Sequence, residues 1–101
     1  MKEGDLQKAI IDYLRIKKFV VVKFPSVGIW RKDTQSYIRQ PRRGVSDILA
    51  CQPKTGHFIA IECKVGRNQA TPEQLEFLAE VEKCGGIAIL AYQLEDVMEV
   101  L

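Results

Sequence analysis

The sequence predicts an α/β domain in which helices pack over a central mixed β-sheet. Segments with helical periodicity alternate along the chain with short segments rich in β-branched residues. Residues 45–64 have the order of an antiparallel hairpin, whereas 57–92 have the strand–helix–strand order of a parallel crossover. A sheet with both kinds of neighbour is mixed. The 101 residues suffice for one core, so we expect a single domain over 1–101.

The first helix is expected over residues 5–17. Apolar residues recur there at helical spacing, namely Leu6, Ala9, Ile10, Tyr13 and Leu14. Asp5 is suited to the N-cap position. Continuing the stripe backwards places Glu3 on the face of Ile10. We therefore expect Glu3 to point toward the core, which is unusual for an acid without a function.

Strands are expected to follow. The segment 19–24, FVVVKF, has strong β propensity and ends at Pro25. Residues 28–40 are compatible with two short strands around a polar turn at 32–36. After a break at 41–44, the segments 45–51 and 57–64 are expected to form a hairpin across a turn at 52–56.

The second helix has a strong predicted start. Thr71 suits the N-cap, Pro72 the first helical position, and Gln74 the partner position of a capping box. The helix should end near residue 84, before two glycines, and its expected apolar face consists of Leu75, Leu78, Ala79 and Val81. A buried strand at 87–92 and a short helix at 94–101 complete the prediction.

The sequence argues against a membrane-spanning protein and against a secreted one. No apolar run is long enough to cross a bilayer, and the start MKEGDLQ lacks the apolar core of a signal peptide. We therefore expect a cytoplasmic protein. The three cysteines, Cys51, Cys63 and Cys84, show no Cys-x-x-Cys spacing. They are expected to be small buried thiols in a reducing compartment.

Positive charge is concentrated, although the net charge is only +2. The cluster comprises Arg31, Lys32, Arg39, Arg42 and Arg43. Trp30 and Tyr37 lie among these residues, and such a mixture can follow a phosphate backbone and stack on bases. A solvated hairpin face, with the aromatic rings packed in the core, is the alternative. Arg42 and Arg43 are the best placed for phosphate contact, and Arg67 is a further candidate.

Two acids and a lysine carry the chemistry. The strand period puts Glu62 and Lys64 on one face, and pairing of the two hairpin strands would bring Asp47 close to Glu62. Adjacent carboxylates repel each other unless a cation neutralises them. Oxygen ligands suit Mg²⁺ or Mn²⁺, and the Cys63 backbone carbonyl could add another oxygen. Lys64 could then orient a water molecule or stabilise charge on a phosphate.

An E-x-K triplet alone is common, and strand acids often face water. The conjunction of features is more specific. A Gly-x-x-Asp precedes E-x-K by one hairpin, each lies on an apolar strand, and a helix carrying Gln74 follows. GVSD, IECK and TPEQ together resemble the PD-(D/E)XK nuclease superfamily, and within it the VRR-NUC domain. Ser46 replaces the proline of the family's proline–aspartate pair. The resemblance implies a restriction-endonuclease-like core.

Residue by residue, the resemblance implies that Asp47 and Glu62 bind the metal and that Lys64 is the catalytic lysine. It also implies site roles for Glu3, as a holder of the metal or its water, and for Gln74. Gln7, one turn after Glu3, is a weaker candidate. His57, at a strand start beside the turn, is expected to be structural or exposed.

At the level of function, the resemblance implies a homodimeric Mg²⁺- or Mn²⁺-dependent endonuclease. Its substrate would be branched DNA such as Holliday junctions, in the cytoplasm of a bacterium or a phage-infected host. Two alternatives stay open. One is a non-catalytic nucleic-acid-binding module, and the other is a nuclease subunit active only in a larger complex.

Overall fold

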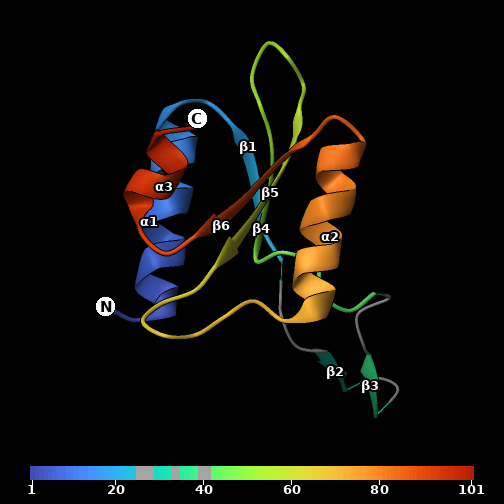
Figure 1. The fold of residues 1–101 in the computed structure, drawn as a ribbon. Coiled ribbons are helices and arrows are strands. Elements are labelled where there is room, and N and C mark those ends of the chain that lie inside the picture. Colours follow the sequence, from blue (N-terminus) through green and yellow to red (C-terminus); the bar gives the residue numbers. More distant parts are fainter. Residues whose placement is uncertain (25–28, 33–34, 39–41) are drawn as a thin grey trace.

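The computed structural model of the chain describes residues 1–24, 29–32, 35–38 and 42–101. Its elements follow the predicted order (Figure 1). They are α1 (Glu3–Ile16), β1 (Val20–Lys23), β2 (Ile29–Arg31), β3 (Ser36–Ile38), β4 (Ile48–Cys51), β5 (Phe58–Cys63), α2 (Pro72–Lys83), β6 (Ile87–Ala91) and α3 (Leu94–Met98).

The main sheet has four strands in the order β1-β4-β5-β6. The pairs β1–β4 and β4–β5 are antiparallel, whereas β5–β6 is parallel and is connected through α2. β2 and β3 form a separate antiparallel ribbon. In Figure 1, α1 and α3 lie on one side of the main sheet and α2 lies on the other. The predicted α/β class with a mixed sheet is therefore confirmed.

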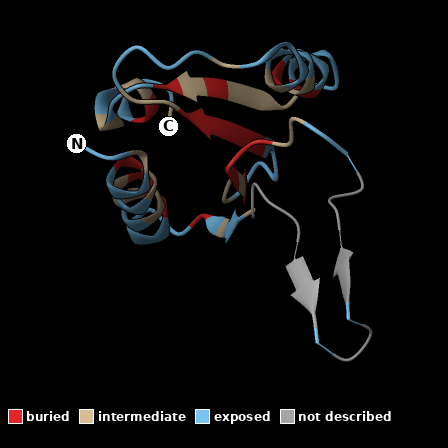
Figure 2. Ribbon diagram, turned by 90° about the horizontal axis from the view of Figure 1, so that it is seen from below, coloured by how far each residue is buried: buried red, intermediate tan, exposed pale blue. Residues whose placement is uncertain are grey.

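Strand alternation divides the core between the two faces of the sheet. Ile59, Ile61 and Cys63 are fully buried in the larger cluster, which also contains the apolar stripe of α1. Ala60 lies in the smaller cluster with Leu78 of α2. Figure 2 shows the buried residues concentrated on the central strands. Because side chains alternate along a strand, Glu62 lies on the same face as Ala60, toward α2.

The start of the first helix differs from the prediction. α1 begins at Glu3 and has Lys2 as its N-cap, so the assignment of Asp5 to the N-cap is wrong. Asp5 lies within the first turn, where its Oδ2 accepts a hydrogen bond from the Lys2 backbone N–H at 3.2 Å. A carboxylate in the first turn is also favourable because it lies near the positive end of the helix dipole.

The second helix starts as predicted, with Thr71 as N-cap, but its buried face is narrower. Leu78 and Val81 are buried, whereas Leu75 is 50% exposed and Ala79 is also exposed. The predicted burial of Leu75 and Ala79 is therefore wrong. Only the side of α2 that carries Leu78 and Val81 packs against the sheet. At the end of the chain, α3 is also shorter than the predicted 94–101.

The cysteines are only partly as predicted. Cys63 is buried, and burial raises the pKa of its thiol to about 12. Cys51 and Cys84 are exposed, so the expectation that all three are buried is wrong. β4 starts three residues later than the predicted segment, and Cys51 at its end points away from the larger cluster.

No helix among the described residues is both long and apolar enough to cross a membrane.

Candidate active site

Asp47 and Glu62 meet at one end of the β4–β5 hairpin. Asp47 directly precedes β4, and the register pairs the next residue, Ile48, with Ile61. The Cys63 backbone N–H donates a hydrogen bond to Asp47 Oδ2 at 3.0 Å, which anchors the Asp47 carboxylate to β5. Asp47 is 6% exposed and Glu62 is 1% exposed. The hairpin thus buries two carboxylates side by side.

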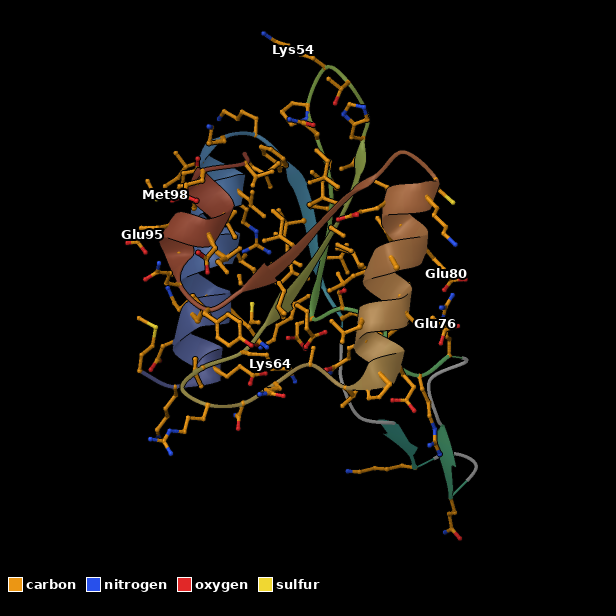
Figure 3. The ribbon with its side chains drawn as sticks, viewed as in Figure 1. Lys54, Lys64, Glu76, Glu80, Glu95 and Met98 are labelled. Atoms are coloured by element: carbon orange, nitrogen blue, oxygen red, sulfur yellow. The ribbon has the colours of Figure 1, made fainter. Side chains whose placement is uncertain are left out.

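The Glu62 carboxylate has a different environment at each oxygen. Oε2 accepts a hydrogen bond from Gln74 Nε2 at 3.3 Å and lies 3.8 Å from Lys64 Nζ. Oε1 is buried and has no hydrogen-bond partner among the described residues. Figure 3 shows Lys64 where β5 leads into the loop toward α2. A buried oxygen without a partner indicates that a ligand is to be expected there.

Electrostatics disfavour the ionised form of Glu62. Desolvation raises the pKa of Glu62 to about 8, and Asp47 acts in the same direction, because its carboxylate is negative and can accept a hydrogen bond only from protonated Glu62. Lys64 lowers this pKa, whereas the charge of Glu3 raises it. A raised pKa from burial and a like charge in one pocket is typical of a functional site. A cation beside both carboxylates would reverse the shift.

Gln74 completes the capping box of α2 and also donates a hydrogen bond to Glu62. Its backbone N–H donates to Thr71 Oγ1 at 3.2 Å, and its Oε1 accepts from the Thr71 N–H at 2.8 Å, which completes the predicted capping box. The Nε2 group of the same side chain donates to Glu62. The cap therefore fixes the amide in the orientation that reaches the buried carboxylate.

Gly44 holds the segment before Asp47 against α2, which the sequence reasoning missed. Its φ is +82°, a conformation that favours glycine. A Cβ at this position would overlap the Glu73 carbonyl and lie 2.9 Å from the Gln74 backbone nitrogen. The backbone of this segment therefore runs directly along the first turn of α2. The glycine in Gly-x-x-Asp was the available signal.

Glu3 is near the site without completing a ligand cluster. Its negative charge makes the smallest contribution to the raised pKa of Glu62, and α1 contacts β5. Within residues 1–24, 29–32, 35–38 and 42–101, however, no three His, Cys, Asp or Glu side chains are grouped to hold a metal ion. The structure brings Asp47, Glu62, Lys64 and Gln74 together, and the role of Glu3 as a ligand stays a prediction.

A family model for the VRR-NUC domain matches residues 1–93, which include every one of these side chains. The chain belongs to the VRR-NUC domain family. It therefore carries a nuclease domain, as the resemblance implied. No curated protein and no solved structure matches the chain.

The VRR-NUC site has a donor set that fits a hard divalent ion. Asp47 and Glu62 supply carboxylate oxygens, and Glu62 Oε1, to which no described residue donates a hydrogen bond, can accept a further contact. Mg²⁺ is commonly held by one or two carboxylates and keeps several of its waters, so two acids with the Cys63 carbonyl are sufficient. Ser46, in place of the proline of the family's motif, is fully buried, and its Oγ has no partner in the described part of the chain.

The basic residues of this VRR-NUC domain that are predicted to contact phosphate differ in their exposure and in their partners. Arg42 pairs with Glu80 and lies over the Phe77 ring at 5.1 Å from its centroid, so its charge is engaged by α2. Exposed positions are occupied by Lys32, Arg43 and Arg67. Arg31 lies in β2, although its side chain is not described, and Arg39 lies outside the described residues.

His57 is exposed, and its Nδ1 lies 3.2 Å from Gln52 Oε1.

Proposed function

We propose that this VRR-NUC domain is a Mg²⁺- or Mn²⁺-dependent endonuclease that hydrolyses phosphodiester bonds in DNA, with branched DNA such as four-way junctions as its substrate. The observation that carries the proposal is the buried Glu62 carboxylate, adjacent to Asp47 and Lys64, with one oxygen that has no partner within the described part of the chain. The cytoplasm of a bacterium or phage-infected host is the proposed place of action.

Each residue has a distinct task in this reaction. A bound divalent ion would lower the pKa of a water molecule and polarise a phosphoryl oxygen. Asp47, held by the Cys63 N–H, and Glu62, held by Gln74, would bind that ion. Lys64 is 13% exposed, so its ammonium group is shielded from bulk water and can orient the attacking water or stabilise negative charge on the phosphate.

The test of catalysis uses purified protein, Mn²⁺ and a labelled four-way junction, with linear duplex and flap substrates alongside. Wild-type protein should cut the junction, and Lys64→Ala should reduce the rate by about two to three orders of magnitude, as loss of one charge-stabilising donor does. Lys54→Ala is the matched control, since Lys54 is exposed at the opposite end of the hairpin (Figure 3). Equal cutting by wild type and Lys64→Ala would remove Lys64 from the mechanism.

A non-catalytic nucleic-acid-binding module is the alternative. Calorimetric titration of the protein with Mn²⁺ separates the two functions, because a pure binder needs no metal site. For a nuclease, the titration should show one saturable Mn²⁺ site, and Asp47→Asn should weaken its affinity for Mn²⁺ at least tenfold. A nuclease subunit active only in a larger complex would bind the metal but cut none of the three substrates.

A homodimer is part of the proposal. It is supported by an apolar hollow of about 420 Å³ beside β1, lined by side chains that include Val20, Val22, Leu49 and Phe58. Val20 is 68% exposed and Val22 is 53% exposed. Of the described strands, β1 lies at the edge of the sheet. An edge strand can pair with its own copy across a two-fold axis, because such an interface is self-complementary.

A further inference from the structure

A second hollow lies beside α1, on the outer side of the molecule. Its volume is about 440 Å³, and it is lined by Gly4, Lys8, Ile11, Asp12, Arg15 and Lys23. Five of these residues come from α1 and one comes from the end of β1. Gly4, Lys8, Asp12 and Arg15 recur at spacings of four, four and three residues, and Ile11 lies beside Asp12, so the helical members follow one face of α1 along its length. The hollow is therefore an elongated groove beside this helix.

Positive charge dominates the groove. Lys8, Arg15 and Lys23 provide three cations, against the single carboxylate of Asp12. Asp12 forms an exposed ion pair with Lys8 at 2.9 Å. Arg15 and Lys23 are both exposed. The excess of two positive charges in the groove equals the net charge of the whole chain, so the remaining residues are neutral in sum.

The groove begins next to the active site. Gly4 lies in the first turn of α1, and α1 contacts β5, the strand that carries Glu62. At the β1 end, Lys23 pairs with Ile48, the residue after Asp47, and the backbone N–H of Phe24 donates to the Asp47 carbonyl at 2.8 Å. A strand whose scissile phosphate lies at Asp47 and Glu62 could therefore continue around this end of the sheet into the groove, which lies on the α1 side.

The outer side of α2 has the opposite charge. Glu73, Glu76 and Glu80 are exposed there, and Figure 3 shows Glu76 and Glu80 on the side of α2 that faces away from the sheet. Arg42 offsets the charge of Glu80, so Glu73 and Glu76 carry the remaining negative charge. A polyanion is repelled from such a surface. The α1 side is thus the favourable direction for DNA to leave the site.

We propose that the groove lined by Lys8, Arg15 and Lys23 binds the phosphate backbone of DNA on one side of the scissile bond, an inference that rests on the proposed function. Gly4 and Arg15 are eleven residues apart, which corresponds to about 16 Å along a helix that rises about 1.5 Å per residue. One DNA strand advances about 3.4 Å per nucleotide, so the groove accommodates about five nucleotides.

The experiment measures binding of fluorescent four-way-junction and duplex DNA in EDTA, by anisotropy over a series of salt concentrations. The double variant Arg15→Ala/Lys23→Ala should bind about tenfold more weakly at low salt. The slope of log affinity against log salt should fall by about two, because each phosphate contact contributes about 0.9. The charge-conserving double variant Arg15→Lys/Lys23→Arg should bind like wild type.

The matched control is Lys54→Ala/Lys83→Ala, which removes the same charge from exposed positions away from the groove. If both charge-removing variants weaken binding equally, net charge alone explains the effect and the groove assignment is wrong. Unchanged binding by Arg15→Ala/Lys23→Ala would also overturn it, while leaving the nuclease proposal intact. If wild-type protein binds RNA but neither DNA, the groove proposal and the DNA nuclease proposal both fail.

Discussion

The Glu62 carboxyl is an acid whose surroundings oppose its charge. It is 1% exposed, and its nearest carboxylate neighbour, Asp47, is anchored by a backbone N–H. Lys64 offsets only part of the cost, at 3.8 Å from Oε2. Without a metal, the folded protein therefore prefers protonated Glu62, and a cation at Oε1 would restore the ionised form.

This preference predicts a pH dependence of stability. The pKa of Glu62 is about 8 in the folded protein and 4.5 for an unperturbed glutamate. Because the folded pKa is raised, the stabilising contribution is complete below pH 4.5 and is lost as pH rises toward 8. In EDTA, the free energy of unfolding should fall over this range by at most about 1.4 kcal/mol per pH unit.

Urea unfolding at several pH values measures this effect. Glu62→Gln should remove the decline and be more stable than wild type at pH 8. Glu76→Gln, at an exposed position on α2, should keep the decline and is the control. A decline that persists in Glu62→Gln would assign the titration to another group.

At the scale of elements, the site depends on two contacts of α2. The capping box sets the Gln74 side chain, and Gly44 lets the segment before β4 lie against Glu73 and Gln74. The pair between Arg42 and Glu80 ties the same segment to the helix further along. The distance between Asp47 and Gln74 is therefore decided by the packing of a loop on a helix, since neither contact lies in the sheet.

We expect Gly44→Ala to separate these elements. The new Cβ would meet backbone atoms of Glu73, which cannot move without breaking the helix start. Gly56→Ala is the matched control, because Gly56 has a similar φ of +72° and open space around it. Strain alone should cost about 1 kcal/mol at both positions, and the overlap should add about 1–2 kcal/mol at Gly44.

Thermal unfolding and the cleavage rate provide the measurements for this pair. Gly44→Ala should lose both stability and activity, whereas Gly56→Ala should lose only stability. Equal losses in both variants would show that the contact with α2 has no role in placing Asp47.

In the whole molecule, helices cover one face of the sheet, whereas the other face is covered only in part. α1 and α3 cover the face of the larger core cluster, and α2 covers β5 and β6 on the other face. The apolar side chains of β1 on that second face are exposed. Such a face with an edge strand is a natural interface between two copies.

The proposed dimer is tested by Val22→Lys. A lysine on the edge strand should shift the wild-type dimer to monomer, as sedimentation equilibrium would show, because its charge cannot be buried between two copies. Val100→Lys is the control, since Val100 is 54% exposed and Val22 is 53% exposed. A monomeric wild type, or an equal effect of both variants, would contradict the proposal.

Local patterns in the sequence were enough to predict most of the fold and the central part of the site. The order of elements, the hairpin and the Thr71 cap follow from two-residue and helical periodicities and from turn residues, which act over short stretches of chain. The same strand period placed Glu62 and Lys64 on one face. Family resemblance added Gln74 and Glu3.

Contacts between segments far apart in the chain could not be predicted in this way. The pairing of Arg42 with Glu80 of α2 could not be read from the sequence, and the contact of Arg42 with phosphate stays a prediction. Leu75 was expected in the core, yet it is exposed. The raised pKa of Glu62 and the contact of Gly44 with Glu73 also depend on residues far away in sequence. The physical reason is that burial and electrostatic environment are set by long-range packing, on which local periodicity carries no information.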